Sequence, residues 1–127
     1  MPLSRLVLLI SGLLFALLGA GFLVWPARWA EFVDIFLPTS TARTDLRATY
    51  GGFDLAFGMF LLVTGARRDW IRPGLVACGL AFSGLAGGRL LGFWVEGTGI
   101  PRLYAFFAIE VIGGALAFYA FSREQVR

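Results

Sequence analysis

The sequence predicts an all-α membrane protein, a four-transmembrane-helix up-down bundle with a short interfacial helix in its first loop. Two observations support this prediction. Hydrophobic residues make up 58% of the chain, and the mean hydropathy is +0.79. Four apolar runs, each long enough for a helix to cross a hydrocarbon core of ~30 Å, occupy nearly all of the 127 residues. We therefore expect residues 1–127 to form a single membrane domain.

The four expected spans cover residues 6–25, 46–66, 73–95 and 103–121. The first has the position of a signal peptide, but its apolar core is longer than the usual ~7–15 residues, and no small-residue cleavage site follows it. We therefore expect this segment to be retained as a membrane helix. The short turns that join the later spans favour the up-down arrangement.

The residue pattern of the first loop predicts a short helix that lies on the outer membrane surface. Pro26 suits the first turn of such a helix, and Pro38 cannot continue it. Between the two prolines, four apolar side chains recur at helical spacing: Trp29, Phe32, Val33 and Phe36. A hydrophobic loop packed on the bundle is the alternative. The run Thr39–Thr41 supplies capping candidates for the helix that follows.

All basic residues are arginines, and their placement predicts the topology. One group falls on the side of the two termini and the second turn: Arg5, Arg67, Arg68, Arg72, Arg123 and Arg127. A smaller group of arginines falls on the other side, where nearby acidic residues offset their charge. This group consists of Arg28, Arg43 and Arg102. The positive-inside rule then predicts a multi-pass protein of a bacterial inner membrane with both termini in the cytoplasm. The net charge of +3 is not a signal of nucleic-acid binding, and we expect no nucleic-acid partner.

The composition argues against metal and redox cofactors. The chain has no histidine and one cysteine, Cys78, so the usual ligand sets of zinc, haem and iron–sulfur centres are missing. We therefore expect no metal, no cofactor and no catalytic residue. An enzyme that uses Asp54 or Glu110 as a general acid or base is the least favoured class, because no nucleophile–base pair is evident.

Charged residues inside or at the edge of the spans are the candidate functional residues: Arg47, Asp54, Arg89, Glu96 and Glu110. An ionisable group within a bilayer normally faces a partner or a water-filled cavity. Because successive helices run in opposite directions, residue counts predict the depth of each charge. Asp54, Arg89 and Glu110 should share one level, ~10 Å below the outer ends of their helices, whereas Arg47 and Glu96 should lie near the surface.

These levels predict specific pairs. We expect Arg89 to hold one or both of the inner carboxylates, and Arg47 to pair with Glu96 at the outer rim. The surplus carboxylate must then be protonated, hydrated or bound to something outside the chain. Glu110 is the first candidate for that role, because its span contains no arginine.

Small residues recur along the same helix faces. They are predicted to let the helices approach closely, as is usual for helices that associate in lipid. The residues concerned are Gly51, Gly52, Gly58, Gly88, Gly92 and Gly113.

Three interpretations of the charges stay open. They can fix helix register without any ligand, line a polar pocket open to the periplasmic face, or belong to an ion or proton pathway. We favour a pocket that binds a small or amphipathic ligand, such as a lipid or a quinone-like molecule, without catalysis. The expected lining residues are Arg47, Tyr50, Asp54, Arg89, Glu96 and Glu110.

Two other classes of membrane protein remain as alternatives. The chain could be the protomer of an oligomeric proton-linked transporter or channel. It could also be an accessory subunit that docks on a membrane protein partner through its phenylalanine-rich surface. Besides the lipid bilayer, the expected partners are therefore a second copy of the chain or another membrane protein.

Three short motifs combine charged residues with glycine: Arg47-Ala-Thr-Tyr50-Gly51-Gly52, Gly88-Arg89, and Glu110 with Gly113-Gly114. They resemble a family of small bacterial four-span membrane proteins known as domain of unknown function 4345, over roughly residues 6–121. The resemblance implies fold and location and carries no established activity. That family is similar to the wider group of DoxX-like membrane proteins, some of which are subunits of quinone-linked oxidoreductases. This chain lacks a redox residue cluster, so that activity is not carried over.

Overall fold

The computed structural model describes residues 1–97 and 99–124, so Arg127 of the predicted cytoplasmic group lies outside the described residues. Within these ranges the chain is helical and contains no strand. Four of the described segments are long and apolar enough to cross a membrane: Leu3–Val24, Ser40–Ala66, Arg68–Glu96 and Pro101–Arg123. The prediction of an all-helical chain with four candidate spans is confirmed, and it suggests a multi-pass membrane protein.

The helices follow one another with short connections. In order they are α1 (Leu3–Val24), α2 (Pro26–Glu31), α3 (Ser40–Leu46), the π-helical segment η1 (Arg47–Phe53), α4 (Asp54–Ala66), the 3₁₀ turn η2 (Arg68–Trp70), α5 (Ile71–Glu96) and α6 (Pro101–Arg123). The segments α3, η1 and α4 join without a break into one long helix. The hydroxyl oxygen of Thr39 accepts a hydrogen bond from the backbone N–H of Ala42 at 3.1 Å, which confirms the predicted cap.

The helix in the first loop is shorter than the apolar spacing indicates. α2 begins at Pro26, as expected, but it ends at Glu31, and Asp34 adopts a left-handed backbone with φ 60°. Trp29 packs on the ring of Phe22 in α1, with the ring centroids 5.9 Å apart. Some apolar side chains of the first loop therefore pack on α1 and α3. The alternative of a hydrophobic loop packed on the bundle describes this arrangement.

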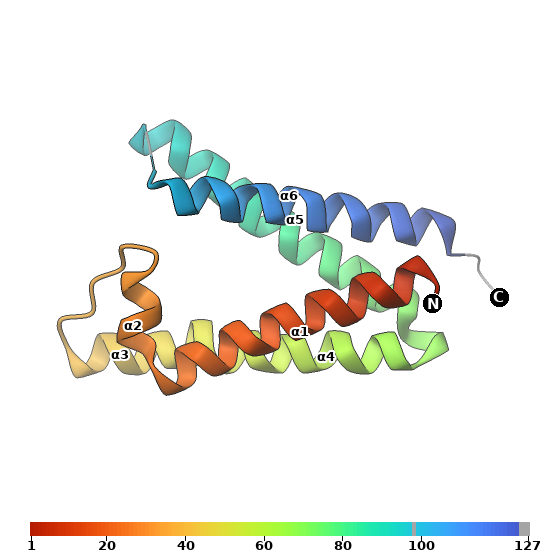
Figure 1. Cartoon of the computed structure of the whole chain (residues 1–127), viewed down its shortest axis with the longest axis horizontal. Coiled ribbons are helices and arrows are strands. Elements are labelled where there is room, and N and C mark those ends of the chain that lie inside the picture. The colour runs from red at the N-terminus through yellow and green to blue at the C-terminus, as the bar shows by residue number, and fades with distance from the viewer. Residues whose placement is uncertain (98, 125–127) are drawn as a thin grey trace.

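The long helices are arranged as two antiparallel pairs (Figure 1). α1 packs along α4, and α5 packs along α6. The two pairs converge at the end that holds the N-terminus, the α4–α5 turn and the last turn of α6, and they splay apart toward the opposite end. We refer to these as the closed end and the open end of the molecule.

Glycines bring α1 and α4 into backbone contact. A Cβ on Gly58 would lie 2.4 Å from the backbone nitrogen of Ala16, and a Cβ on Gly19 would lie 2.3 Å from that of Leu55. Such distances leave no room for any side chain, so this pair depends on the absence of a Cβ, as expected for helices that associate in lipid.

The other glycines predicted to pack differ in their surroundings. A Cβ on Gly51 would meet the side chain of Leu23, and one on Gly113 would meet the ring of Phe82. A Cβ on Gly52 would lie 3.7 Å from the backbone oxygen of Arg47. Around Gly88 and Gly92, apart from the adjacent residues and the nearby backbone of the same helix, no atom of the described chain lies within 4 Å of a built Cβ. The expectation of close packing therefore does not extend to Gly52, Gly88 or Gly92.

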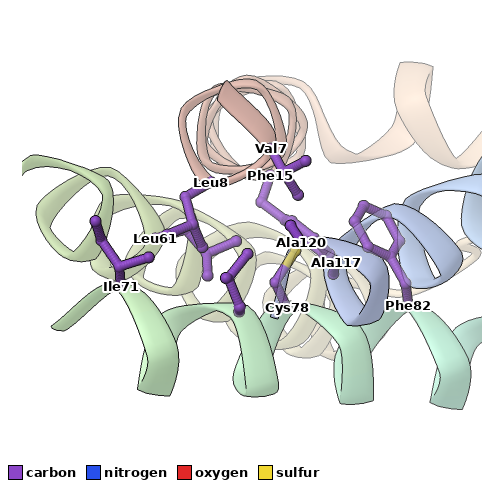
Figure 2. Close-up of a cluster of buried hydrophobic side chains, with 10 residues drawn as sticks. Val7, Leu8, Phe15, Leu61, Ile71, Cys78, Phe82, Ala117 and Ala120 are labelled. Carbon is purple, nitrogen blue, oxygen red and sulfur yellow. The ribbon is translucent and has the colours of Figure 1, made fainter. Parts of the chain in front are cut away.

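An apolar core fills the closed end (Figure 2). It brings together side chains of α1, α4, α5 and α6, among them Val7, Leu8, Phe15, Leu61, Ile71, Cys78, Phe82, Ala117 and Ala120. Polar contacts add to it, because the Ser4 hydroxyl donates to the Glu124 carboxylate at 2.6 Å and the Arg72 guanidinium donates to the Glu124 carbonyl. The pairs are thus held together at one end, which leaves space between them at the other.

Candidate functional site

A pocket of about 420 Å³ lies between the two helix pairs. Its walls come from α1, the loop after α2, η1, the start of α4, α5 and α6. Most of the lining is apolar, and the polar or charged lining residues are Thr49, Tyr50, Asp54, Arg89 and Glu110. This volume and this mixture are typical of small-molecule sites, which measure ~300–1,000 Å³ and place a few polar groups in apolar walls.

An ion pair between neighbouring helices forms one wall. The Nε of Arg89 in α5 donates to both carboxylate oxygens of Glu110 in α6, at 2.8 and 2.9 Å. The Glu110 side chain is only 7% exposed, and the Arg89 side chain is 27% exposed. The guanidinium also lies over the ring of Phe106, 5.5 Å from its centroid. Arg89 is therefore held in place, and it is a lining residue of the pocket whose side chain stays partly exposed.

Asp54, the first residue of α4, belongs to the wall contributed by the other helix pair. It is half-buried, and no hydrogen-bond or ion-pair partner is found for its carboxylate in the part of the chain that the structure describes. The surplus carboxylate is thus Asp54 and not Glu110, contrary to expectation. The reason is that Arg89 and Glu110 lie on adjacent helices of one pair, whereas Asp54 lies on the pair that splays away from them.

The expected outer ion pair is absent among residues 1–97 and 99–124. The Nε of Arg47 donates instead to the carbonyl oxygen of Leu23 at 3.0 Å, and so binds one of the last carbonyls of α1, which lack helical partners. Glu96 is exposed at the end of α5. Both residues lie toward the open end, where the helix pairs are farthest apart. Neither residue lines the pocket.

Tyr50 does line the pocket, and it belongs to a segment whose conformation the sequence did not indicate. Its ring packs against that of Phe22, with the centroids 5.2 Å apart. Tyr50, Thr49 and Phe53 all belong to the π-helical turn η1, which ends immediately before Asp54. Such turns occur frequently at functional sites. The one sequence feature that could have indicated η1 is the pair Gly51-Gly52, because glycine weakens regular helix formation.

The loop after α2 covers the pocket at the open end. The Nη1 of Arg102 in α6 donates to the carbonyl oxygen of Phe32 at 3.0 Å, and the guanidinium lies 4.6 Å from the centre of the Phe32 ring. Val33 and Ile35, which follow Phe32, contribute to the lining. The contact with Arg102 therefore ties the loop to the opposite helix pair across the mouth of the pocket.

Replacing Arg102 with alanine is expected to free this loop. A hydrogen bond to a charged donor stabilises by ~1.5–3 kcal/mol, so amide exchange at residues 33–35 should quicken by about tenfold or more. Hydrogen–deuterium exchange followed by mass spectrometry measures this. Arg28→Ala, an exposed arginine of α2, is the matched control and should leave the rate unchanged. Equal exchange in the two variants would show that Arg102 does not hold the loop.

Exposed residues in the lining indicate that the pocket is also open sideways, between the helix pairs. Four apolar residues of its lining are at least one-third exposed: Leu14 of α1, Ile109 of α6, Phe53 of η1 and Leu85 of α5. Since these helices are candidate spans, the side openings face the region that lipid chains occupy in a bilayer. A ligand dissolved in the membrane could therefore enter without crossing the loop after α2.

The chain belongs to the family described as domain of unknown function (DUF4345), which it matches over residues 3–121. That match includes all of the pocket residues. No curated protein and no solved structure matches the chain. The family description names no activity, so any function has to be inferred from the site itself.

Proposed function

We propose that this member of the DUF4345 family is a bacterial inner-membrane protein, an up-down bundle with both termini in the cytoplasm, that binds a small amphipathic ligand without catalysis. The DoxX-like kinship belongs to the same proposal. The observation that supports binding most strongly is a pocket with apolar walls that contains one ion pair and one carboxylate without a partner in the described chain. The pocket would lie in the periplasmic half of the bilayer.

The distribution of arginine supports this orientation. The closed end holds the N-terminus, the α4–α5 turn and the end of α6, and the residues there include Arg5, Arg67, Arg68, Arg72 and Arg123. Cytoplasmic segments carry an excess of such residues. α2 would then lie at the periplasmic membrane surface, with Phe36 of the following loop, 84% exposed, available to lipid.

A purely structural role explains only part of the site. The pair Arg89–Glu110 alone could fix α5 against α6 without any ligand. Asp54 is not part of that pair and faces a cavity from the other pair of helices. An ionisable group at such a depth needs a partner or water. A bound ligand supplies that partner, which a lock between α5 and α6 does not.

Binding is also favoured over conduction. Toward the closed end, the rings of Phe15 and Phe82 lie 5.4 Å apart, and beyond them the buried side chains are apolar or carry only neutral hydroxyls, as Ser4, Ser11 and Thr64 do. An ion or proton would meet no ionisable relay in the described core. The pocket therefore suits a molecule that enters and leaves by the same half of the membrane.

Native mass spectrometry of protein released from its own membranes in mild detergent tests this proposal. The wild type should carry a discrete added mass, and Leu85→Trp should reduce its retention by about tenfold, equivalent to ~1.4 kcal/mol, because the larger side chain fills the pocket. Leu80→Trp is the matched control on α5, since Leu80 is 61% exposed and lies outside the lining. A bare wild-type protein, or equal retention in Leu85→Trp, would contradict the proposal.

A further inference from the structure

The free hydrogen-bonding groups of the pocket indicate what kind of head group it would accept. Arg89 contacts Glu110 through Nε alone, although a guanidinium carries five N–H donors. For its Nη1 and Nη2 groups, no acceptor is found among the residues that the structure describes. Two guanidinium nitrogens in one plane match two oxygens of a phosphate or carboxylate. This wall of the pocket is therefore suited to an oxyanion.

The opposite wall of the pocket favours a cationic group instead. An ionised Asp54 offers acceptor oxygens only, and it faces the same cavity. A ligand with an oxyanion alone would add negative charge to a site that already contains two carboxylates and one guanidinium. A ligand with an ammonium alone would leave the free N–H groups of Arg89 without an acceptor. A zwitterion satisfies both walls.

The openings of the pocket indicate where the rest of the ligand would lie. The core closes one end, and the contact between Arg102 and Phe32 covers the other. At the sides, Phe53 is 66% exposed and Leu85 is 40% exposed, and both are apolar. An apolar tail could thus leave between the helix pairs and lie among the lipid chains, while a pocket of about 420 Å³ holds the head group.

We propose that the ligand is a zwitterionic lipid of the phosphoethanolamine type, with its phosphate on Arg89, its primary ammonium on Asp54 and its acyl chains in the side openings. This inference rests on the proposed function and specifies the ligand of the same site. A primary ammonium is favoured over a quaternary one because only the former can donate hydrogen bonds to Asp54. A phosphoglycerol head group has no cation to offer and should bind more weakly.

The test is a competition in native mass spectrometry. Purified protein is mixed with equal amounts of phosphoethanolamine, phosphocholine and phosphoglycerol lipids that share the same acyl chains. The wild type should retain the phosphoethanolamine lipid over the phosphoglycerol lipid by about tenfold, the ratio that one charge-assisted hydrogen bond can provide. Asp54→Asn, which keeps the shape of the side chain, should remove the preference. Asp69→Asn, at the exposed α4–α5 turn, is the matched control and should keep it.

The possible outcomes separate the two proposals. Retention of lipid without a head-group preference, or a preference that Asp54→Asn leaves unchanged, overturns the zwitterionic ligand and leaves the binding function standing. A wild-type protein that retains no molecule under any condition overturns both. Soluble phosphoethanolamine forms a further arm. If soluble phosphoethanolamine displaces the lipid at equal concentration, the acyl chains contribute nothing to the affinity, and the assignment to a lipid is wrong. The preference of the wild type is informative even if a variant does not fold.

Discussion

Replacing Arg89 with alanine is expected to lower the free energy of unfolding by about 3–5 kcal/mol, because the variant leaves a buried carboxylate without its counter-charge. Glu110 is 7% exposed, and both of its oxygens accept from the Nε of Arg89. Protonation of Glu110 would reduce the loss but would not restore the contact between α5 and α6. Thermal or denaturant unfolding of the purified protein in detergent measures the change.

Two further variants make this result specific. Arg68→Ala removes an exposed arginine of the α4–α5 turn and should change stability by no more than about 0.5 kcal/mol. Replacing both members of the pair, as Arg89→Met with Glu110→Leu, should recover most of the lost stability, since apolar residues of similar volume can substitute for a buried pair. Under our proposals, this double variant would still be unable to bind the oxyanion of a ligand. If Arg89→Ala were as stable as the wild type, the Arg89–Glu110 pair would not be central to the stability of the fold.

Replacing Gly58 with leucine is expected to disrupt the α1–α4 pair. The free energy of unfolding should fall by more than the ~1–3 kcal/mol that ordinary overpacking costs. A Cβ at this position would lie 2.4 Å from the nitrogen of Ala16 and 2.6 Å from the carbonyl oxygen of Gly12. These are backbone atoms, which cannot rotate away as a side chain could. The helices would have to separate, with loss of the contacts along their length.

Gly88→Leu is the matched control, because a Cβ at Gly88 meets no described atom within 4 Å beyond its chain neighbours and the nearby backbone of its own helix. Removing a glycine from a helix stabilises it by about 0.5–1 kcal/mol, so this variant should melt at or slightly above the wild-type temperature. The yield of monodisperse protein and its melting temperature in detergent compare the two. Equal loss in Gly58→Leu and Gly88→Leu would mean that backbone contact does not set the stability of the α1–α4 pair.

Sequence alone was sufficient to predict the four long apolar helices, and residue counts along them predict a similar depth for Asp54, Arg89 and Glu110, which line one pocket. Span length and hydropathy predict helices because each backbone polar group in a bilayer must find its partner within the chain. The rise of ~1.5 Å per residue then relates residue counts to depth. The pair Arg89–Glu110 was among the predicted possibilities for this reason. Pro26 and Thr39 likewise mark helix starts, because their effects on the backbone are local.

Only the tertiary structure decided which groups meet at a given level. Depth does not determine how far apart two helix pairs stand, and their splaying leaves Asp54 without the arginine that Glu110 obtains. The same splaying separates Arg47 from Glu96, and Arg47 binds the end of α1 instead. Close contact at Gly58 and open space at Gly88 also depend on which helices pack. Helix formation and depth follow from local geometry, whereas these contacts depend on long-range packing, which residue spacing does not encode.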